Sequence, residues 1–178
     1  MISCKKLSFF LFLLLIDLAA TAQSIKKYPI GNSGCSMYCY SEPENGETEY
    51  SEDSSIIYKA FSFIDEYEYG VICVKLFEPI EDLESAEAMS KGYCDYLKTV
   101  FDIEESAGYG MGHKMDSYEH ATGFIDYWKD KEGDEWKIKC WTNGAVIAFM
   151  YVTHTGSLPS EDFNKQETFL NGFRFPEE

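Results

Sequence analysis

Two runs of strand-forming residues in the last third of the chain are joined by its clearest turn. Residues 136–141 form the first run and residues 145–152 the second, with Asn143 and Gly144 between them. Asn-Gly tolerates positive φ at both central positions of a two-residue turn, so this pattern predicts an antiparallel hairpin. The second run is apolar on both alternating faces, which predicts a strand that is covered on both sides inside a sheet.

Other apolar runs predict strands upstream of this hairpin. Residues 55–64 alternate in polarity and residues 69–77 are largely apolar, which predicts a second hairpin. Shorter strands are expected at residues 36–40 and 122–128. Residues 103–112 form a strand-like segment with alternate glycines, a pattern that favours a bulge over a phosphate-binding loop.

The apolar period lengthens to three or four residues over residues 81–100, which predicts an amphipathic helix. Gly92 lies inside this segment, and a glycine that weakens a helix predicts close packing onto the sheet. The expected buried stripe consists of Leu83, Ala86, Met89 or Ser90, Tyr93, Leu97 and Val100.

A C-terminal helix is predicted at residues 160–172. Ser160 is suited to the N-cap position, and two acidic residues follow it in the first turn. These elements predict an α+β fold, in which one antiparallel sheet of about six strands carries both helices. The buried side of the second helix would consist of Phe163, Gln166 or Glu167, Leu170 and Phe173.

The first 22 residues have the pattern of a secretory signal peptide. A basic start precedes a short apolar run, and Ala20 and Ala22 form a small-x-small cleavage site. The run is too short to cross a bilayer comfortably, so we expect a soluble product in the periplasm or outside the cell, without a membrane span. Residues 23–34 are expected to form an irregular lead-in, and residues 35–178 a single α+β domain.

Acidic residues outnumber basic ones, 31 to 15, which gives a formal net charge of −16. This charge disfavours nucleic acid and anionic membranes as partners and favours a basic protein, although it also serves solubility alone. One stretch without basic residues contains Glu47, Glu49, Glu52 and Asp53. These four residues predict an interaction surface for a basic partner, with a flexible solvated loop as the alternative.

Five cysteines follow the predicted cleavage site, and their spacing matches no zinc-ligand pattern. Cys73, Cys94 and Cys140 fall on predicted strands and on the long helix, where a thiol serves as a small apolar core group. Cys35 and Cys39 lie at a predicted strand start, where a disulfide with either is possible, and the sequence leaves the pairing open.

Candidate chemistry is sparse, and no cofactor or metal is expected. Were a ligand groove present, Tyr109 and His113 in the glycine-rich segment would be the first residues to test. Trp128 and Trp141 predict either an exposed recognition face or aromatic core residues. The three histidines have no surrounding catalytic motif, and the acidic loop at residues 130–135 fits a hairpin better than a calcium site.

The order of elements and the closing segment at residues 169–175 resemble the PsbP/DcrB-like α/β/α sandwich family. Members typically close with a Phe-Leu-x-Ser-Phe type of segment, and this chain has Gly172 where serine is usual. The resemblance covers residues 35–175 and implies an exported accessory protein that binds partners more than it catalyses reactions. It carries over no binding residue, because the partner sites of the family share no motif with this chain.

These observations predict an exported, soluble, non-enzymatic binding or accessory protein that acts through protein contact. An immunity-type inhibitor of a basic secreted toxin is a narrower alternative. A small-ligand carrier with a cleft between helix and sheet is another alternative, and a metal-dependent hydrolase is the least favoured.

Overall fold

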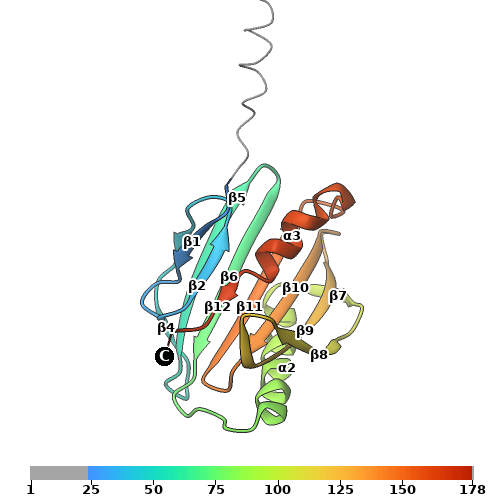
Figure 1. Ribbon diagram of the computed structural model, residues 1–178. Coiled ribbons are helices and arrows are strands. Elements are labelled where there is room, and N and C mark those ends of the chain that lie inside the picture. The colour runs from blue at the N-terminus through green and yellow to red at the C-terminus, as the bar shows by residue number, and fades with distance from the viewer. Residues whose placement is uncertain (1–23, 178) are drawn as a thin grey trace, which may run out of the picture.

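Nine antiparallel strands form one sheet through the middle of the protein (Figure 1). The computed structural model describes residues 24–177, so the predicted signal peptide lies outside the described residues. The sheet order is β3 (Glu44–Asn45), β5 (Ile56–Ile64), β6 (Tyr67–Lys75), β11 (Val146–His154), β10 (Glu135–Thr142), β9 (Tyr118–Asp130) and β7 (Ile103–Ser106). At its two edges, β4 (Glu49–Tyr50) pairs with β5, and β8 (Gly110–Met115) pairs with β9.

Strand β11 lies at the centre of this sheet between β6 and β10, as its two apolar faces predict. The hairpin that joins β10 to β11 is also confirmed, but the predicted turn geometry is wrong. Gly144 alone has positive φ, and the Asn143 side chain instead accepts hydrogen bonds from the backbone N–H groups of Ala145 and Val146. The turn is therefore centred on Gly144 and Ala145, because one glycine at its first central position is sufficient.

The second predicted hairpin is confirmed as well. Ile64 pairs with Tyr67 across a two-residue turn, in which Asp65 has positive φ. The fold is thus α+β, with a mostly antiparallel sheet and two helices, as the hydrophobic pattern predicts.

A separate small sheet contains β1 (Lys26–Pro29), β2 (Ser36–Cys39) and β12 (Phe173–Arg174) in the order β1-β2-β12. The expectation of an irregular lead-in at residues 23–34 is therefore wrong at β1. The prediction of one sheet of about six strands is also too simple. Strands of two to four residues carry almost no period of their own, so tertiary pairing decides their conformation.

Helix α2 (Leu83–Val100) begins at the N-cap Asp82, whose side chain accepts a hydrogen bond of 2.8 Å from the Ser85 N–H. The residues that it buries against the sheet are Ala86, Glu87, Ser90, Cys94 and Leu97. Met89 and Val100 are exposed, so the predicted stripe is only partly correct. Gly92 is also exposed, and an added Cβ would meet no atom within 4 Å, so its predicted close packing is wrong.

Helix α3 (Phe163–Leu170) follows the short 3-10 helix η1 (Ser160–Asp162). The N-cap of α3 is Asp162 rather than Ser160, because the intervening turn is wound as a 3-10 helix. The buried residues of α3 are Gln166, Phe169 and Leu170, whereas Phe163 is exposed. Phe173 is buried as predicted, but it lies in β12.

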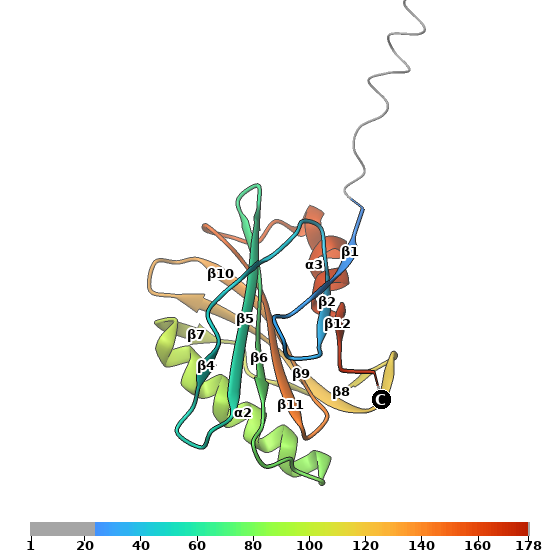
Figure 2. The same ribbon diagram turned by 90° about the vertical axis from the view of Figure 1, so that its left-hand side faces the viewer.

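The central sheet separates two hydrophobic cores. Face A is the side that carries Tyr58, Val71 and Met150, and it packs against the small sheet and α3. Face B is the side that carries Ile72 and Phe149, and it packs against α2. Figure 2 shows the sheet nearly edge-on, with α2 on one side and α3 and the small sheet on the other. Neither helix in the described part of the chain has the length and apolar character needed to cross a membrane.

Candidate binding groove

Helix α2 covers only part of face B, because it packs mainly on β7, β9 and β10. Beside it, the strands β5 and β6 form the floor of a groove of about 670 Å³. Helix α2 supplies one wall and the segment around β4 supplies the other. We call this hollow the α2–β5 groove. The residues that define it are Tyr50, Ile57, Phe61, Ile72, Tyr96 and Val100.

The wall formed by α2 is a second apolar stripe of the same helix. Met89, Tyr93, Tyr96 and Val100 follow one another at helical spacing, and Tyr96 remains 61% exposed. Met89, Tyr93 and Val100 are the residues that the hydrophobic pattern assigns to the core. The pattern shows that they are apolar, but it does not show that the sheet offers nothing to cover them. The apolar surface of α2 covers more of the helix than the sheet can bury. That surplus is the signal that could have predicted the groove.

Tyr151 closes one end of the groove floor. Its ring lies over Gly70, where an added Cβ would overlap the ring, and its hydroxyl donates a hydrogen bond of 2.6 Å to Glu68. Burial, and then the neighbouring Glu68 carboxylate, raise the pKa of Tyr151 well above its ordinary value. The hydroxyl therefore stays neutral and donates to the Glu68 carboxylate.

The opposite wall carries acidic residues. Glu49 and Glu52 line the groove beside Tyr50, which is 72% exposed. The Glu49 carboxylate pairs with Lys59 at 2.6 Å, so an internal cation already occupies a position on this wall. Asp53 accepts hydrogen bonds from the Ser51 hydroxyl and the Ser55 N–H, and the first of these lowers its pKa most. Asp53 lies outside the groove and Glu49 is paired with Lys59, so Glu52 is the acidic residue that lines this wall without an ion pair among the described residues.

The acidic segment predicted as an interaction surface thus divides in two. Glu49 and Glu52 face the groove, whereas Glu47 and Asp53 are exposed outside it. These residues are exposed to solvent, as the alternative of a flexible solvated loop predicts, but the two-residue strands β3 and β4 pair with β5.

Trp128 and Trp141 form no exposed recognition face, because both are almost completely buried. The Trp128 indole N–H donates to Asp126 at 2.6 Å, and the Trp141 indole N–H donates to the Leu170 carbonyl at 3.1 Å. The alternative interpretation as aromatic core residues is confirmed. Each indole N–H therefore has a hydrogen-bond acceptor, which a buried tryptophan usually finds.

Tyr109 and His113 lie away from the groove, at the edge formed by β8. The Tyr109 hydroxyl donates to Asp95 and accepts from the Lys98 ammonium at 2.9 Å. Burial, followed by the hydrogen bond to Asp95, raises the pKa of Tyr109. His113 is half-buried beside a register shift between Gly110 and His113, which confirms the predicted bulge. Tyr109 also packs against Phe124 of the face B core, and neither Tyr109 nor His113 lines the α2–β5 groove.

The glycine-rich segment folds around Asp126, a fully buried carboxylate that sequence reasoning missed. Asp126 accepts hydrogen bonds from the Ser106 hydroxyl at 2.6 Å and the Gly108 N–H at 2.9 Å, and it lies 3.4 Å from the Lys98 ammonium. A buried carboxylate with this many hydrogen-bond donors stabilises the local fold. An aspartate among the apolar residues of a predicted strand was the only signal in the sequence.

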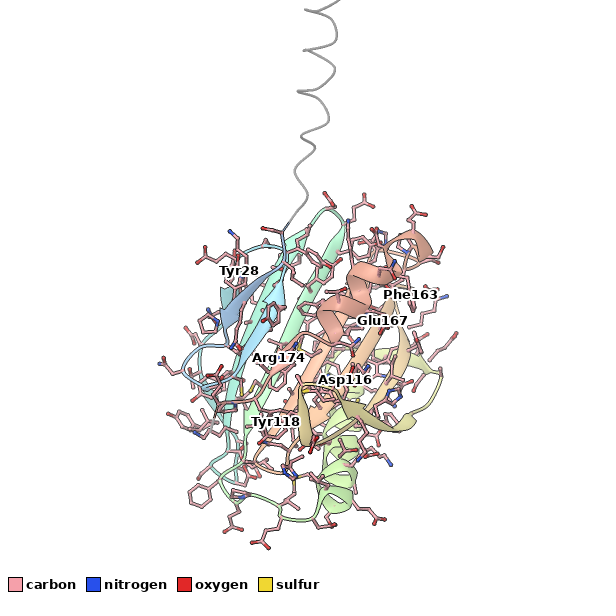
Figure 3. The ribbon with its side chains drawn as sticks, viewed as in Figure 1. Tyr28, Asp116, Tyr118, Phe163, Glu167 and Arg174 are labelled. Carbon is pink, nitrogen blue, oxygen red and sulfur yellow. The ribbon has the colours of Figure 1, made fainter. Side chains whose placement is uncertain are left out.

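A second hollow of about 600 Å³ lies on face A between η1 and β9–β10. Its lining includes charged side chains, among them Lys137, whose ammonium pairs with Glu167 at 2.6 Å and lies 3.9 Å from the centre of the Phe163 ring. Figure 3 shows Phe163 and Glu167 on α3 above this part of the sheet. The internal pair accounts for the Lys137 charge without a ligand.

Among residues 24–177, no group of three or more histidine, cysteine, aspartate or glutamate side chains could hold a metal ion. The five described cysteines are free and buried. Cys73, Cys94 and Cys140 belong to the two hydrophobic cores, which confirms their predicted role.

Comparison of the chain with protein-family models and with curated proteins found no match. The resemblance to the PsbP/DcrB-like family therefore stays a prediction. Any assignment of function must come from the geometry of the chain itself.

Proposed function

We propose that this protein is an exported, soluble, non-enzymatic binding protein, and that it holds a basic protein partner in the α2–β5 groove. One observation carries the proposal: exposed apolar side chains from α2 and β4, with half-buried ones from β5, converge on a groove that has acidic residues on one wall. Export is supported by the predicted signal peptide at residues 1–22 and by the resemblance to exported accessory proteins.

The apolar side chains in this groove are more exposed than a purely structural role requires. Tyr50 belongs to β4 and Tyr96 and Val100 belong to α2, yet all three lie around one hollow. Apolar side chains gathered on one surface mark interaction sites, whereas single exposed ones carry no meaning. Aromatic anchors at the centre of an interface supply most of its binding energy, so Tyr50 and Tyr96 are the residues expected to contribute most.

Charge selects the partner. Glu49 and Glu52 border the groove, and the whole chain carries a net charge of −16. A basic partner would be attracted at long range and would meet carboxylates and aromatic faces at the groove, both of which favour Lys or Arg side chains. A basic secreted toxin, with this protein as its immunity factor, is one partner of that description.

A photo-crosslinking residue placed at position 96 tests the proposal, with the same residue at position 127 as the matched control. Tyr127 is a similarly exposed tyrosine on face A, outside the groove. We expect position 96 to capture one basic protein in stoichiometric amount, and position 127 to capture none. With that protein purified, Tyr96→Ala should weaken binding by about tenfold or more, and Tyr127→Ala should leave it unchanged.

Charge-reversing substitutions test how much the acidic residues of the groove contribute to binding of the partner. Glu49→Lys and Glu52→Lys should slow association and weaken its dependence on salt, since rim charges act mainly on the association rate. Capture at position 127 alone, or an acidic partner at position 96, would contradict the proposal.

The groove volume favours a second candidate, a carrier of a small ligand. About 670 Å³ lies within the range of roughly 300–1,000 Å³ that is typical of ligand sites. Native mass spectrometry of the purified protein should then show a bound compound that denaturation releases. Ile57→Trp would fill the floor and remove that mass, whereas a groove for a protein partner would show no bound compound in the wild type.

A further inference from the structure

The fold covers one face of β5 and leaves the other open. On face A, the side chains of Tyr58, Ala60 and Ser62 are all buried. The alternate residues of the strand lie on face B, and these are half-buried or exposed: Ile57, Lys59, Phe61 and Phe63. The central sheet therefore lacks a covering layer on face B at this strand.

Helix α2 presents a row of apolar side chains beside this opening. Met89, Tyr93, Tyr96 and Val100 recur at intervals of four, three and four residues, which is the spacing with which one helix packs along another. Tyr96 is 61% exposed and Val100 is 52% exposed, so residues 24–177 leave this row largely uncovered. The row extends over eleven residues, which is about 16 Å along the helix axis.

The opening has the width of one helix. Neighbouring strands lie about 4.8 Å apart and a helix with its side chains is about 10 Å wide, so one helix covers about two strands. Two strands, β5 and β6, form the floor of the α2–β5 groove, and the segment with β4 bounds its far side (Figure 2). A helix placed there would lie beside α2 and pack on Ile57 and Phe61.

An added strand would not fit, because the edge of β5 at the groove is already paired. Strand β4 pairs with Ile57 and strand β3 pairs with Phe61. Between them, the Gly46 N–H donates to the Lys59 carbonyl at 2.9 Å. Strand addition requires free backbone groups at a sheet edge. A helix makes its backbone hydrogen bonds internally, so it needs only side-chain contacts in the groove.

The wall opposite α2 determines which charge the helix should carry. Glu49 and Glu52 line this wall, and Glu49 pairs with Lys59 at 2.6 Å. Glu52 has no ion pair among the described residues, so its carboxylate is available to a cation. A helix with basic residues on the side next to β4 would complement this wall.

We infer that the partner segment in the α2–β5 groove is an amphipathic helix of about three turns. Its apolar row packs between α2 and the floor of the groove, and its Lys or Arg side chains lie toward Glu52. This inference rests on the proposed function, because it assigns the form of the segment that occupies the same groove. The bound helix would complete the covering of face B beside α2.

Photo-crosslinking from both ends of the exposed row tests the form of this segment. Benzoylphenylalanine replaces Met89 or Val100 in the full-length protein within the cells that produce it, and mass spectrometry identifies the linked partner residues. The two positions are about 16 Å apart, which corresponds to about eleven residues of a helix and about five of an extended chain. We expect linked residues about eleven apart, in a segment that contains Lys or Arg.

The matched control is benzoylphenylalanine at position 84. Glu84 is exposed on the same helix but lies about 140° around its axis from Met89, so we expect no link to the partner.

A synthetic peptide of the linked segment gives a second measurement. A helix of three turns is marginal in water, so the peptide should gain helix, measured by circular dichroism, when it binds the protein. Proline in the middle of the peptide, on the side away from the linked residues, should weaken binding by about tenfold or more. Alanine at the same position is the control and should leave binding unchanged.

Linked residues about five apart, or a peptide that binds without gaining helix, would overturn the inference and leave the proposed function intact. A link to a second copy of this chain would also overturn it. Absence of any link from positions 89, 96 and 100 would instead overturn the proposed function, and this inference with it.

Discussion

Helices α2 and α3 cover opposite faces of one sheet by different chemistry. Beneath α3, the two lysines of β10 are buried, and each has a partner: Lys137 pairs with Glu167 at 2.6 Å and Lys139 donates to Asn171 at 2.7 Å. Beside α2, by contrast, Tyr96 and Val100 are exposed around an apolar groove. On face A, buried charges with partners serve stability, whereas on face B uncovered apolar groups line the groove to which we assign binding.

Trp141→Ala should give the largest effect and should separate the two faces. Trp141 is 1% exposed, packs on face A and donates its indole N–H to the Leu170 carbonyl of α3. We expect it to lower the free energy of unfolding by about 3–5 kcal/mol, because a large cavity opens and an acceptor loses its donor. Urea denaturation measures this loss.

Tyr96→Ala is the comparison for that experiment. It removes an aromatic side chain from the exposed lip of the groove, so the change in unfolding free energy should stay within about 0.5 kcal/mol. A loss as large as that of Trp141→Ala would mean that the groove wall is part of the core.

Glu167→Ala should be the next largest change, since it leaves the Lys137 ammonium buried and unpaired. Lys137 is 2% exposed, and we expect a loss of about 2–3 kcal/mol at neutral pH. Burial acts to raise the pKa of Glu167, but Lys137 outweighs it and holds the pKa below its usual value. The stabilisation is therefore complete above the unfolded pKa of about 4.3 and is lost as the pH falls through the folded pKa.

Acid denaturation of the wild type and of Glu167→Ala checks whether the stabilisation by this ion pair is lost as the pH falls. Their stabilities should converge at low pH and differ most near neutrality. The double variant Lys137→Met and Glu167→Ala should recover much of the loss, because it removes both charges together. A constant difference at every pH would show that packing, and not the ion pair, is responsible.

Gly70→Ala should reshape the groove rather than the core. An added Cβ would overlap the Tyr151 ring, which covers Gly70 at the groove floor. The ring must then move toward the groove, at a cost of about 1–2 kcal/mol in stability. Binding of the purified partner should fall in parallel. Unchanged binding despite that destabilisation would place the contact surface elsewhere on α2.

The hydrophobic pattern predicts the long strands of this fold and the four-residue β2, but it misses β1 and the two-residue strands β3, β4 and β12. Strands β5, β6, β10 and β11 have eight or nine residues each, enough for an alternating or continuous apolar run to be recognised. Strand β12 has two residues, and only pairing with β2 makes it a strand. Local sequence cannot contain that information, because the partner lies more than a hundred residues away.

The groove was less predictable for a related reason. Glu49 and Glu52 are recognisable from charge alone, but Tyr93 and Val100 look like core residues in the sequence. Whether an apolar side chain is buried depends on how far α2 reaches across the sheet, which no local pattern records. Trp128 and Trp141 show the converse, since their size suggested recognition and their neighbours bury them.

Gly92→Ala is expected to give a small effect with the opposite sign. Gly92 is exposed on α2, and an added Cβ would meet no atom within 4 Å, so alanine adds no clash. The glycine costs helix stability because the unfolded chain loses more backbone freedom there, and its replacement should raise the unfolding free energy by about 0.5–1 kcal/mol. Thermal denaturation of both variants should show a higher melting temperature for Gly92→Ala and a lower one for Gly70→Ala, although the chemical change is the same. A loss of stability in Gly92→Ala would mean that α2 is covered at this position, and that the open side of face B is narrower than its exposed tyrosines indicate.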